Sequence, residues 1–208
     1  MQAQLKKENN RLMVRLCHLF TRSSAHYALG TVLATGLIGG SILAYAGFNW
    51  ALELTDTETF CITCHEMEQN AYREYTRTIH YMNRTGVRAT CSDCHVPKTW
   101  THKVARKIHA SKEVFHHFAG TIDTPEKYEA RRLQLAKNVW AAMKETDSRE
   151  CRNCHNYDSM DLSIQQRHSR ERHEQGIDEE KTCIDCHKGV AHELPAGTYE
   201  AEKQISLK

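Results

Sequence analysis

The stretch 61-CITCH-65 places two cysteines and a histidine in the order C-x-x-C-H, and this order returns three more times along the chain. The later copies are 91-CSDCH-95, 151-CRNCH-155 and 183-CIDCH-187. Eight of the nine cysteines therefore lie in four motifs of one type, and Cys17 alone is left over. A single C-x-x-C is compatible with several chemistries, but four copies that all end in histidine narrow the choice.

The motif matches the way in which haem c is attached to protein. Two thiols add to the two haem vinyl groups, and the histidine after the second cysteine is placed to bind the iron. The sequence therefore predicts four covalently bound haems. The expected attachment residues are Cys61, Cys64, Cys91, Cys94, Cys151, Cys154, Cys183 and Cys186, and the expected iron ligands within the motifs are His65, His95, His155 and His187.

Two other uses of paired cysteines fit this pattern less well. Two zinc sites, each built from two C-x-x-C units, would explain the cysteines but would not require a histidine in the fifth position every time. A disulfide framework has no use for four adjacent histidines, and oxidised C-x-x-C loops are mostly redox-active.

An apolar stretch precedes the first motif. From Ser23 to Leu52 there is no Asp, Glu, Lys or Arg, and 28-ALGTVLATGLIGGSILAYAGF-48 is predominantly apolar. As a helix, these residues would span roughly 31 Å, which matches the hydrocarbon core of a bilayer. The sequence therefore predicts one transmembrane helix, at residues 25–52, that anchors the chain in the lipid bilayer.

Charge is distributed unevenly on the two sides of this helix. Residues 1–24 carry five basic side chains and one acidic side chain, a net of +4, whereas the rest of the chain carries 23 basic and 25 acidic side chains, a net of −2. By the positive-inside tendency, residues 1–24 stay in the cytoplasm and residues 53–208 form a periplasmic domain of a bacterial inner-membrane protein. Nothing in this balance suggests a nucleic-acid partner.

Two features of the apolar stretch allow other readings. Ala44-Tyr45-Ala46 fits the cleavage pattern of a signal peptide, but the stretch is longer than the usual apolar region of about 7–15 residues. Gly36 and Gly40 form a G-x-x-x-G pair, which would let two helices approach closely, either in a homodimer or with another partner. Glycine is also common in membrane helices without such a role.

The fold predicted for the soluble part is mainly α. Four haems in a domain of about 155 residues would fill much of the interior, so we expect short helices, many loops and little or no sheet. The clearest helix begins after Thr124, a suitable N-cap, with Pro125 in its first turn. A second helix ends at Gly120, and a third runs from about Asp161 to Gln175.

Four irons have up to eight axial positions, so ligands are also needed from outside the motif histidines. The candidates are His80, His102, His109, His116, His117, His168, His173 and His192. Met67 is another, because thioether sulfur binds haem iron and raises its reduction potential. Since it lies two residues after His65, it would replace His65 on the same face of the haem. Packing over the haem is the alternative role.

Taken together, these features resemble the NapC/NirT family of membrane-anchored tetrahaem quinol dehydrogenases. The resemblance rests on the single N-terminal helix and on six blocks in the family's order, namely CITCHEM, TGVRATCSDCHVP, ARKIHASKE, GTIDTPEKYEARRLQLAKNVW, ECRNCHNYDSMD and KTCIDCHKGVAHELP. It implies that the protein oxidises menaquinol or ubiquinol from the membrane quinol pool. The electrons would pass through four haems to a periplasmic terminal reductase, or to its cytochrome subunit, in anaerobic respiration.

The resemblance also implies iron ligands. It places the haem of the first motif nearest to the quinol site, with Met67 able to bind its iron. It gives His80, His173 and His192 as distal ligands without pairing each of them with a particular haem.

Two quinol-site residues follow from the resemblance as well. Many relatives carry histidine at the position of Lys98, and others carry lysine there, near the bound quinol. The ammonium group would help a quinol hydroxyl lose its proton, and a solvated lysine is the alternative. Some relatives have a carboxylate beside the first haem. Glu113 is carried over to that role as the only acidic residue between Val96 and Ile122.

Two other functions are alternatives to quinol oxidation. A passive electron carrier, fed by another dehydrogenase, would have four saturated haems and no quinol site. A terminal reductase would need an open iron, and multihaem reductases of the nitrite type typically show a C-x-x-C-K motif, which this sequence lacks.

Overall fold

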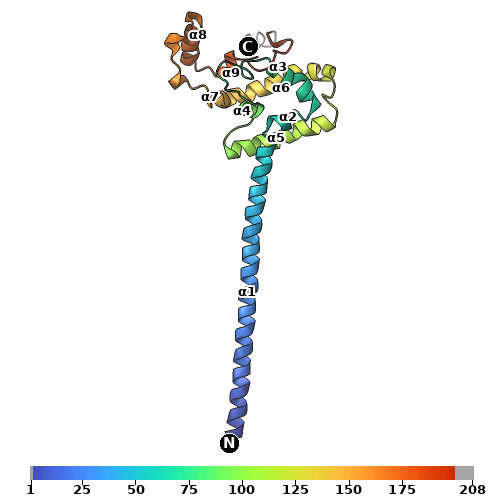
Figure 1. Ribbon diagram of the computed structural model, residues 1–208, viewed down its shortest axis with the longest axis vertical. Helices are drawn as coiled ribbons and strands as arrows, with labels where there is room; N and C mark the ends of the chain where they lie inside the picture. The colour runs from blue at the N-terminus through green and yellow to red at the C-terminus, as the bar shows by residue number, and fades with distance from the viewer. Residues whose placement is uncertain (1, 200–208) are drawn as a thin grey trace. The chain divides into compact units, whose positions relative to one another are not determined.

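The computed structural model describes the backbone of residues 2–199, and within the N-terminal helix it describes the side chains of residues 13–15 and those from residue 26 onward (Figure 1). Cys17 lies outside the described side chains. All regular elements in the described part of the chain are helices, with no strand, so the mainly α prediction is confirmed. These residues fall into two compact units, one ending at Glu53 and the other beginning at Leu54.

The first unit is a single continuous helix, α1 (Gln2–Leu54). Its part from His26 to Leu54 is long and apolar enough to cross a membrane, as predicted. The hydroxyl groups of Thr31, Thr35 and Ser41 donate hydrogen bonds to carbonyl oxygens one turn earlier in the helix. A helix in lipid must satisfy its polar groups internally, and these bonds do so.

The second unit is built from short helices joined by loops. Its elements in chain order are α2 (Glu58–Cys61), the π-helix η1 (Met67–Tyr72), α3 (Arg73–Tyr75), α4 (Cys91–His95), α5 (Trp100–Phe118), α6 (Pro125–Glu145), α7 (Arg149–Arg152), the 3-10 turns η2 (Tyr157–Ser159) and η3 (Leu162–Ile164), α8 (Arg167–Asp178) and α9 (Cys183–Cys186). Helix α2 packs against α4, α4 against α7, and α6 against α9.

The two longest helices of this unit have the predicted ends. Thr124 accepts a hydrogen bond from the backbone N–H of Lys127, so that it caps α6, and Pro125 is the first residue of that helix. Helix α5 ends just before Gly120, whose φ of +63° is the left-handed conformation that glycine adopts most readily.

The third helix differs from the prediction at both ends. Asp161 caps the 3-10 turn η3 instead of α8, because its carboxylate accepts from the backbone N–H of Ser163. Helix α8 then runs through Gly176 to Asp178. It ends in a Schellman motif in which the N–H of Lys181 donates to the carbonyl of Gly176, and Glu180 takes the left-handed position with a φ of +51°.

The polypeptide itself contributes a small apolar core to the second unit. Among its described residues, the buried large apolar side chains are Tyr75, Tyr128 and Ile184. The hydroxyl of Tyr75 donates to the carbonyl of Ala89 over 2.6 Å and accepts from Arg88, so this buried ring also ties α3 to the segment before the second motif.

Candidate haem sites

In the second and fourth motifs, the short motif helix starts with the same capping arrangement. Asp93 accepts hydrogen bonds from the backbone N–H and the hydroxyl of Thr90, at 2.8 and 2.6 Å. Asp185 does the same for Thr182, at 3.0 and 2.9 Å. These capping boxes place each first cysteine at the start of a helical turn. The second cysteine is three residues on, so both thiols lie on the same face of the turn.

The capping aspartates also hold lysines. The ammonium of Lys98 forms an ion pair with Asp93, and the ammonium of Lys144 lies 2.7 Å from Asp185. Lys98, expected from the resemblance to contact quinol, therefore has a partner inside its own motif, and its side chain is 57% exposed.

Glu113, the other expected quinol-site residue, is exposed on α5, and its carboxylate accepts a hydrogen bond from Arg106 over 2.9 Å. The Nε of Arg106 donates to the carbonyl oxygen of His95, so this pair is connected to the second motif.

Three motif histidines lie opposite histidines from elsewhere in the sequence. The ring centres are 6.2 Å apart for His95 and His192, 6.3 Å for His80 and His155, and 5.9 Å for His173 and His187. Two imidazoles that bind one metal ion from opposite sides, each with a metal–nitrogen distance of about 2 Å, have their ring centres roughly 6 Å apart. The residues present therefore fit three haem irons with two histidine ligands each.

The surroundings of these rings suit metal binding. The Nδ1 of His173 donates to the side-chain oxygen of Gln165 over 2.7 Å, and the Nδ1 of His80 lies 3.4 Å from the carbonyl oxygen of Val190. A hydrogen bond at Nδ1 fixes the tautomer that leaves Nε2 available to a metal.

Burial favours the neutral form of three of these imidazoles, which is the form that binds metal. It lowers the pKa of His95 to about 4, with a smaller contribution from the nearby His192. Burial also lowers the pKa of His187 and of His192.

The remaining candidates are not paired in this way. Within the described residues, no ring pair with a motif histidine involves the exposed His102, His109, His116 or His168.

Successive motifs are neighbours in space. Helices α2 and α4, which carry Cys61 and Cys91, pack together. Helix α4 packs against α7 of the third motif. The fully buried Ser148, just before the third motif, accepts a hydrogen bond from the backbone N–H of Ile184 in the fourth motif. The four attachment sites therefore follow one another in chain order.

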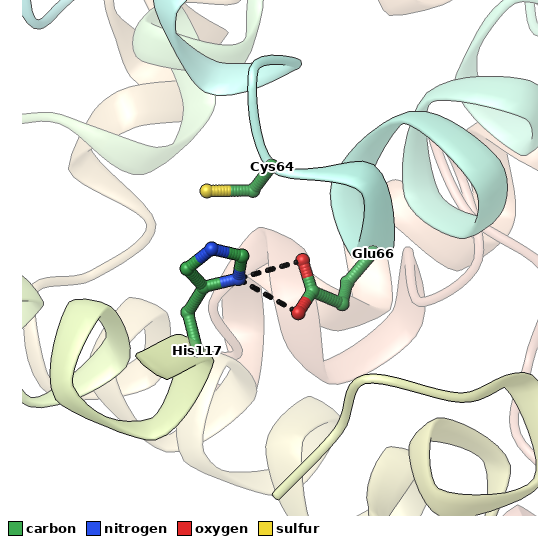
Figure 2. Close-up of side chains that lie close together, drawn as sticks. All are labelled: Cys64, Glu66 and His117. Carbon is green, nitrogen blue, oxygen red and sulfur yellow. Dashed lines mark hydrogen bonds and ion pairs between the residues drawn. The ribbon is translucent and has the colours of Figure 1, made fainter. Parts of the chain in front are cut away.

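The first motif has a different environment. Figure 2 shows Cys64 and Glu66 facing His117, which comes from the C-terminal end of α5. The Nδ1 of His117 lies 2.8 and 3.0 Å from the two carboxylate oxygens of Glu66, so it is the donor to them. The Nε2 of His65 lies 3.7 Å from the same carboxylate. The rings of His65 and His117 are 6.0 Å apart, with the carboxylate in contact with both.

Glu66 is 3% exposed. Burial opposes its ionisation, but its own backbone N–H and His117 outweigh burial and hold the pKa of Glu66 below its usual value. We did not expect a role for Glu66 from the sequence. Its position between two candidate ligands, His65 and Met67, was the only signal, and the contact with His117, 51 residues later, is visible only in the fold.

A second charged cluster holds the chain just before the first motif. The ammonium groups of Lys103 and Lys107 on α5 lie 2.8 and 2.5 Å from the carboxylate of Asp56. Lys107 also donates to the backbone and side-chain oxygens of Thr55, each at 2.9 Å. Burial raises the pKa of Asp56, but the two lysines outweigh it and hold this pKa below its usual value. Helix α5 thus contacts the chain just before the first motif, at Asp56, and just after it, at Glu66.

Four C-x-x-C-H motifs and three facing histidine pairs define the protein as a c-type cytochrome. Residues 22–197 match the NapC/NirT cytochrome c family, N-terminal region. The chain is 56% identical over 185 residues to a protein from Stutzerimonas stutzeri named "Denitrification system component NirT", covering 89% of this chain and 92% of that protein. The chain belongs to the NapC/NirT cytochrome c family, and it is an electron-transfer cytochrome.

Two other relatives agree with this assignment. "Cytochrome c-type protein NapC" of Escherichia coli (strain K12) is 51% identical over 174 residues, which cover 84% of this chain and 86% of that protein. "Putative tetraheme cytochrome-c type" of Allochromatium vinosum is 50% identical over 167 residues, covering 79% of this chain and 90% of that protein. No solved structure matches the chain.

Proposed function

We propose that the protein is a tetrahaem quinol dehydrogenase, anchored in the inner membrane by α1, that passes electrons to a periplasmic reductase. The observation that carries this proposal is the set of three facing histidine pairs beside four C-x-x-C-H motifs. Each haem, when bound, would accept and release one electron at a time, so four adjacent sites would form a conducting chain.

The pairing assigns ligands to three haems. His95 and His192 would bind the second iron, His155 and His80 the third, and His187 and His173 the fourth. The ligands come from distant parts of the chain, since His80 precedes the second motif and serves the third, and His192 follows the fourth motif and serves the second. Such crossing would tie the domain together once the haems are attached. Met67 or His65 is left for the first iron.

Quinol releases two protons with its two electrons, so the site needs groups that accept protons. We propose that Glu113 accepts a proton and that Lys98, as an ammonium, assists the loss of that proton from the quinol. Both groups reach solvent, and each has a partner of opposite charge, Asp93 or Arg106, that can hold it while a quinol hydroxyl approaches. A quinol oxygen would interact with the ammonium of Lys98, and Glu113 would take up the proton.

The remaining parts of the proposal concern topology and partners. Residues 1–24 would lie in the cytoplasm, residues 25–52 in the membrane and residues 53–208 in the periplasm. Since one relative is named for denitrification, we propose a reductase of nitrogen-oxide respiration as the electron acceptor. In the described part of the chain no atom lies within 4 Å of a Cβ built on Gly36 or Gly40, which leaves this face open for a second copy.

The direct test is reduction of the purified full-length protein by a quinol. We expect haem analysis to give four haems per chain and a water-soluble menaquinol analogue to reduce them, with inhibition by a hydroxyquinoline N-oxide. The control is dithionite, which reduces the haems of any cytochrome. Reduction by dithionite but not by menaquinol or ubiquinol analogues would contradict the proposal and would support a passive electron carrier instead.

A further inference from the structure

We propose that Glu66 and His117 select the axial ligand of the first haem by holding His65, so that Met67 binds the iron. This inference rests on the proposed attachment of a haem at Cys61 and Cys64. It assigns a specific task to a buried carboxylate and to a histidine on α5, both of which lie outside the set of ligands.

The contrast with the other motifs carries the argument. There, a second imidazole stands about 6 Å away in a facing pair. At the first motif the ring distance is similar, but the carboxylate of Glu66 contacts both rings, at 3.7 Å from His65 Nε2 and 2.8 Å from His117 Nδ1. Nε2 is the atom that would bind iron in the facing pairs, since the Nδ1 atoms of His80 and His173 have partners in the protein. In the first motif it faces a carboxylate.

The same distances argue against His65 and His117 binding one iron together. If both rings held an iron through Nε2, the Nδ1 of His117 would point away from the iron, and its hydrogen-bond partner would lie far from His65. Instead, one oxygen of Glu66 is close to both rings. Nor is the cluster of Cys64, Glu66 and His117 a site for a free metal ion, although their ligand atoms lie within 4.8 Å of one another. The sulfur of Cys64 would be bonded to the haem proposed at this motif.

Two features make this arrangement persistent. Glu66 is almost fully buried, so losing its hydrogen bond to His117 would leave a buried charge with only its own backbone N–H as a partner, which is unfavourable. The π-helix η1 begins at the next residue, Met67. A π-helical turn inserts an extra residue and is common at functional sites.

The test is a set of variants of the haem-loaded protein, studied by magnetic circular dichroism and redox titration. The wild type should contain one haem whose near-infrared thioether band is lost in Met67→Leu. In Glu66→Gln the released His65 should take over the iron. We expect the thioether band to disappear and the reduction potential of one haem to fall, because imidazole stabilises the oxidised iron better than thioether does.

Three further variants distinguish this change of iron ligand from a general disturbance of the fold. Glu68→Gln alters an exposed glutamate two residues away and should leave band and potential unchanged. His117→Gln keeps a hydrogen-bond donor near Glu66 and should shift the spectrum less than Glu66→Gln. In Glu66→Gln with His65→Asn, the thioether band should return, because the competing imidazole is gone.

Two results would overturn the inference: a wild type without a band that depends on Met67, or a Glu66→Gln protein that keeps both band and potential. Haem content and reduction by quinol are measured on the same samples. They report on the proposed function independently, since four haems and quinol reduction can be present whichever residue binds the first iron.

Discussion

The first motif and the other three share the same five-residue pattern, but their surroundings in the fold differ. Motifs two, three and four each face a histidine from a distant part of the chain, at 5.9–6.3 Å between ring centres. The first motif faces a buried carboxylate. Side chains of α5 form ion pairs with Asp56 and a hydrogen bond with Glu66, on either side of this motif in the sequence. Identical attachment chemistry therefore does not imply identical iron sites. We therefore expect residues outside the pattern to decide whether a site has two imidazoles or a different ligand.

The largest expected effect comes from removing a distal histidine. In His192→Ala the iron opposite His95 would lose a ligand, so we expect one of the three haems with two histidine ligands to become high-spin and its reduction potential to rise. Electron paramagnetic resonance of the oxidised protein would show this, and added imidazole should restore the low-spin signal. His168→Ala, at an exposed and unpaired position on α8, should leave all signals unchanged. Three unaltered low-spin haems with two histidine ligands each in His192→Ala would disprove the pairing.

A smaller effect should follow from cutting the link between the third and fourth motifs. Ser148 is fully buried, and its hydroxyl accepts from the N–H of Ile184. Ser148→Ala leaves that N–H unsatisfied, which costs about 1–3 kcal/mol and lowers Tm by several degrees in thermal denaturation of the haem-loaded protein. Ser169→Ala, on the exposed side of α8, serves as the control. An unchanged Tm for Ser148→Ala would mean that the haems alone hold these motifs together.

The apolar helix, the end of α5 and the start of α6 could be predicted from the sequence, because each depends on a local pattern. The attachment sites stay a prediction from the motif. The sequence also supplied the three distal histidines as candidates. Their pairing could not be predicted, because His80 lies opposite His155 and His192 opposite His95, and such crossings depend on tertiary packing. The same holds for Glu66 and His117, which are 51 residues apart. The predicted end of the third helix, α8, was wrong for a local reason. Glu180, rather than Gly176, adopts the left-handed conformation that ends the helix.

The contact between α5 and the segment before the first motif should weaken at acidic pH, because it depends on the negative charge of Asp56. The pKa of Asp56 is lowered in the folded protein, so its ion pairs with Lys103 and Lys107 stabilise the fold above the unfolded pKa of about 4. This contribution is lost as the pH falls through the lowered, folded-state pKa. Asp56→Asn should therefore reduce Tm at about pH 6–7, and the difference from the wild type should shrink below about pH 4.

Asp178→Asn changes an exposed aspartate of α8 and is the matched control for this comparison. A difference between Asp56→Asn and the wild type that stays constant from neutral to acidic pH would show that the two ion pairs do not hold α5 to the first motif.

The smallest effect on stability is expected from substituting two lysines, and the comparison between them tests the quinol site directly. Lys98 and Lys144 each form an ion pair with a capping aspartate, and both are exposed. Lys98→Gln and Lys144→Gln should each cost less than about 1 kcal/mol of unfolding free energy, as surface ion pairs do. If Lys98 contacts quinol, Lys98→Gln alone should lower the rate of haem reduction by quinol, while reduction by dithionite stays unchanged in both variants. Equal quinol rates in the two variants would confine Lys98 to its structural contact with Asp93, and Glu113→Gln on α5 would be the next variant to test for quinol oxidation.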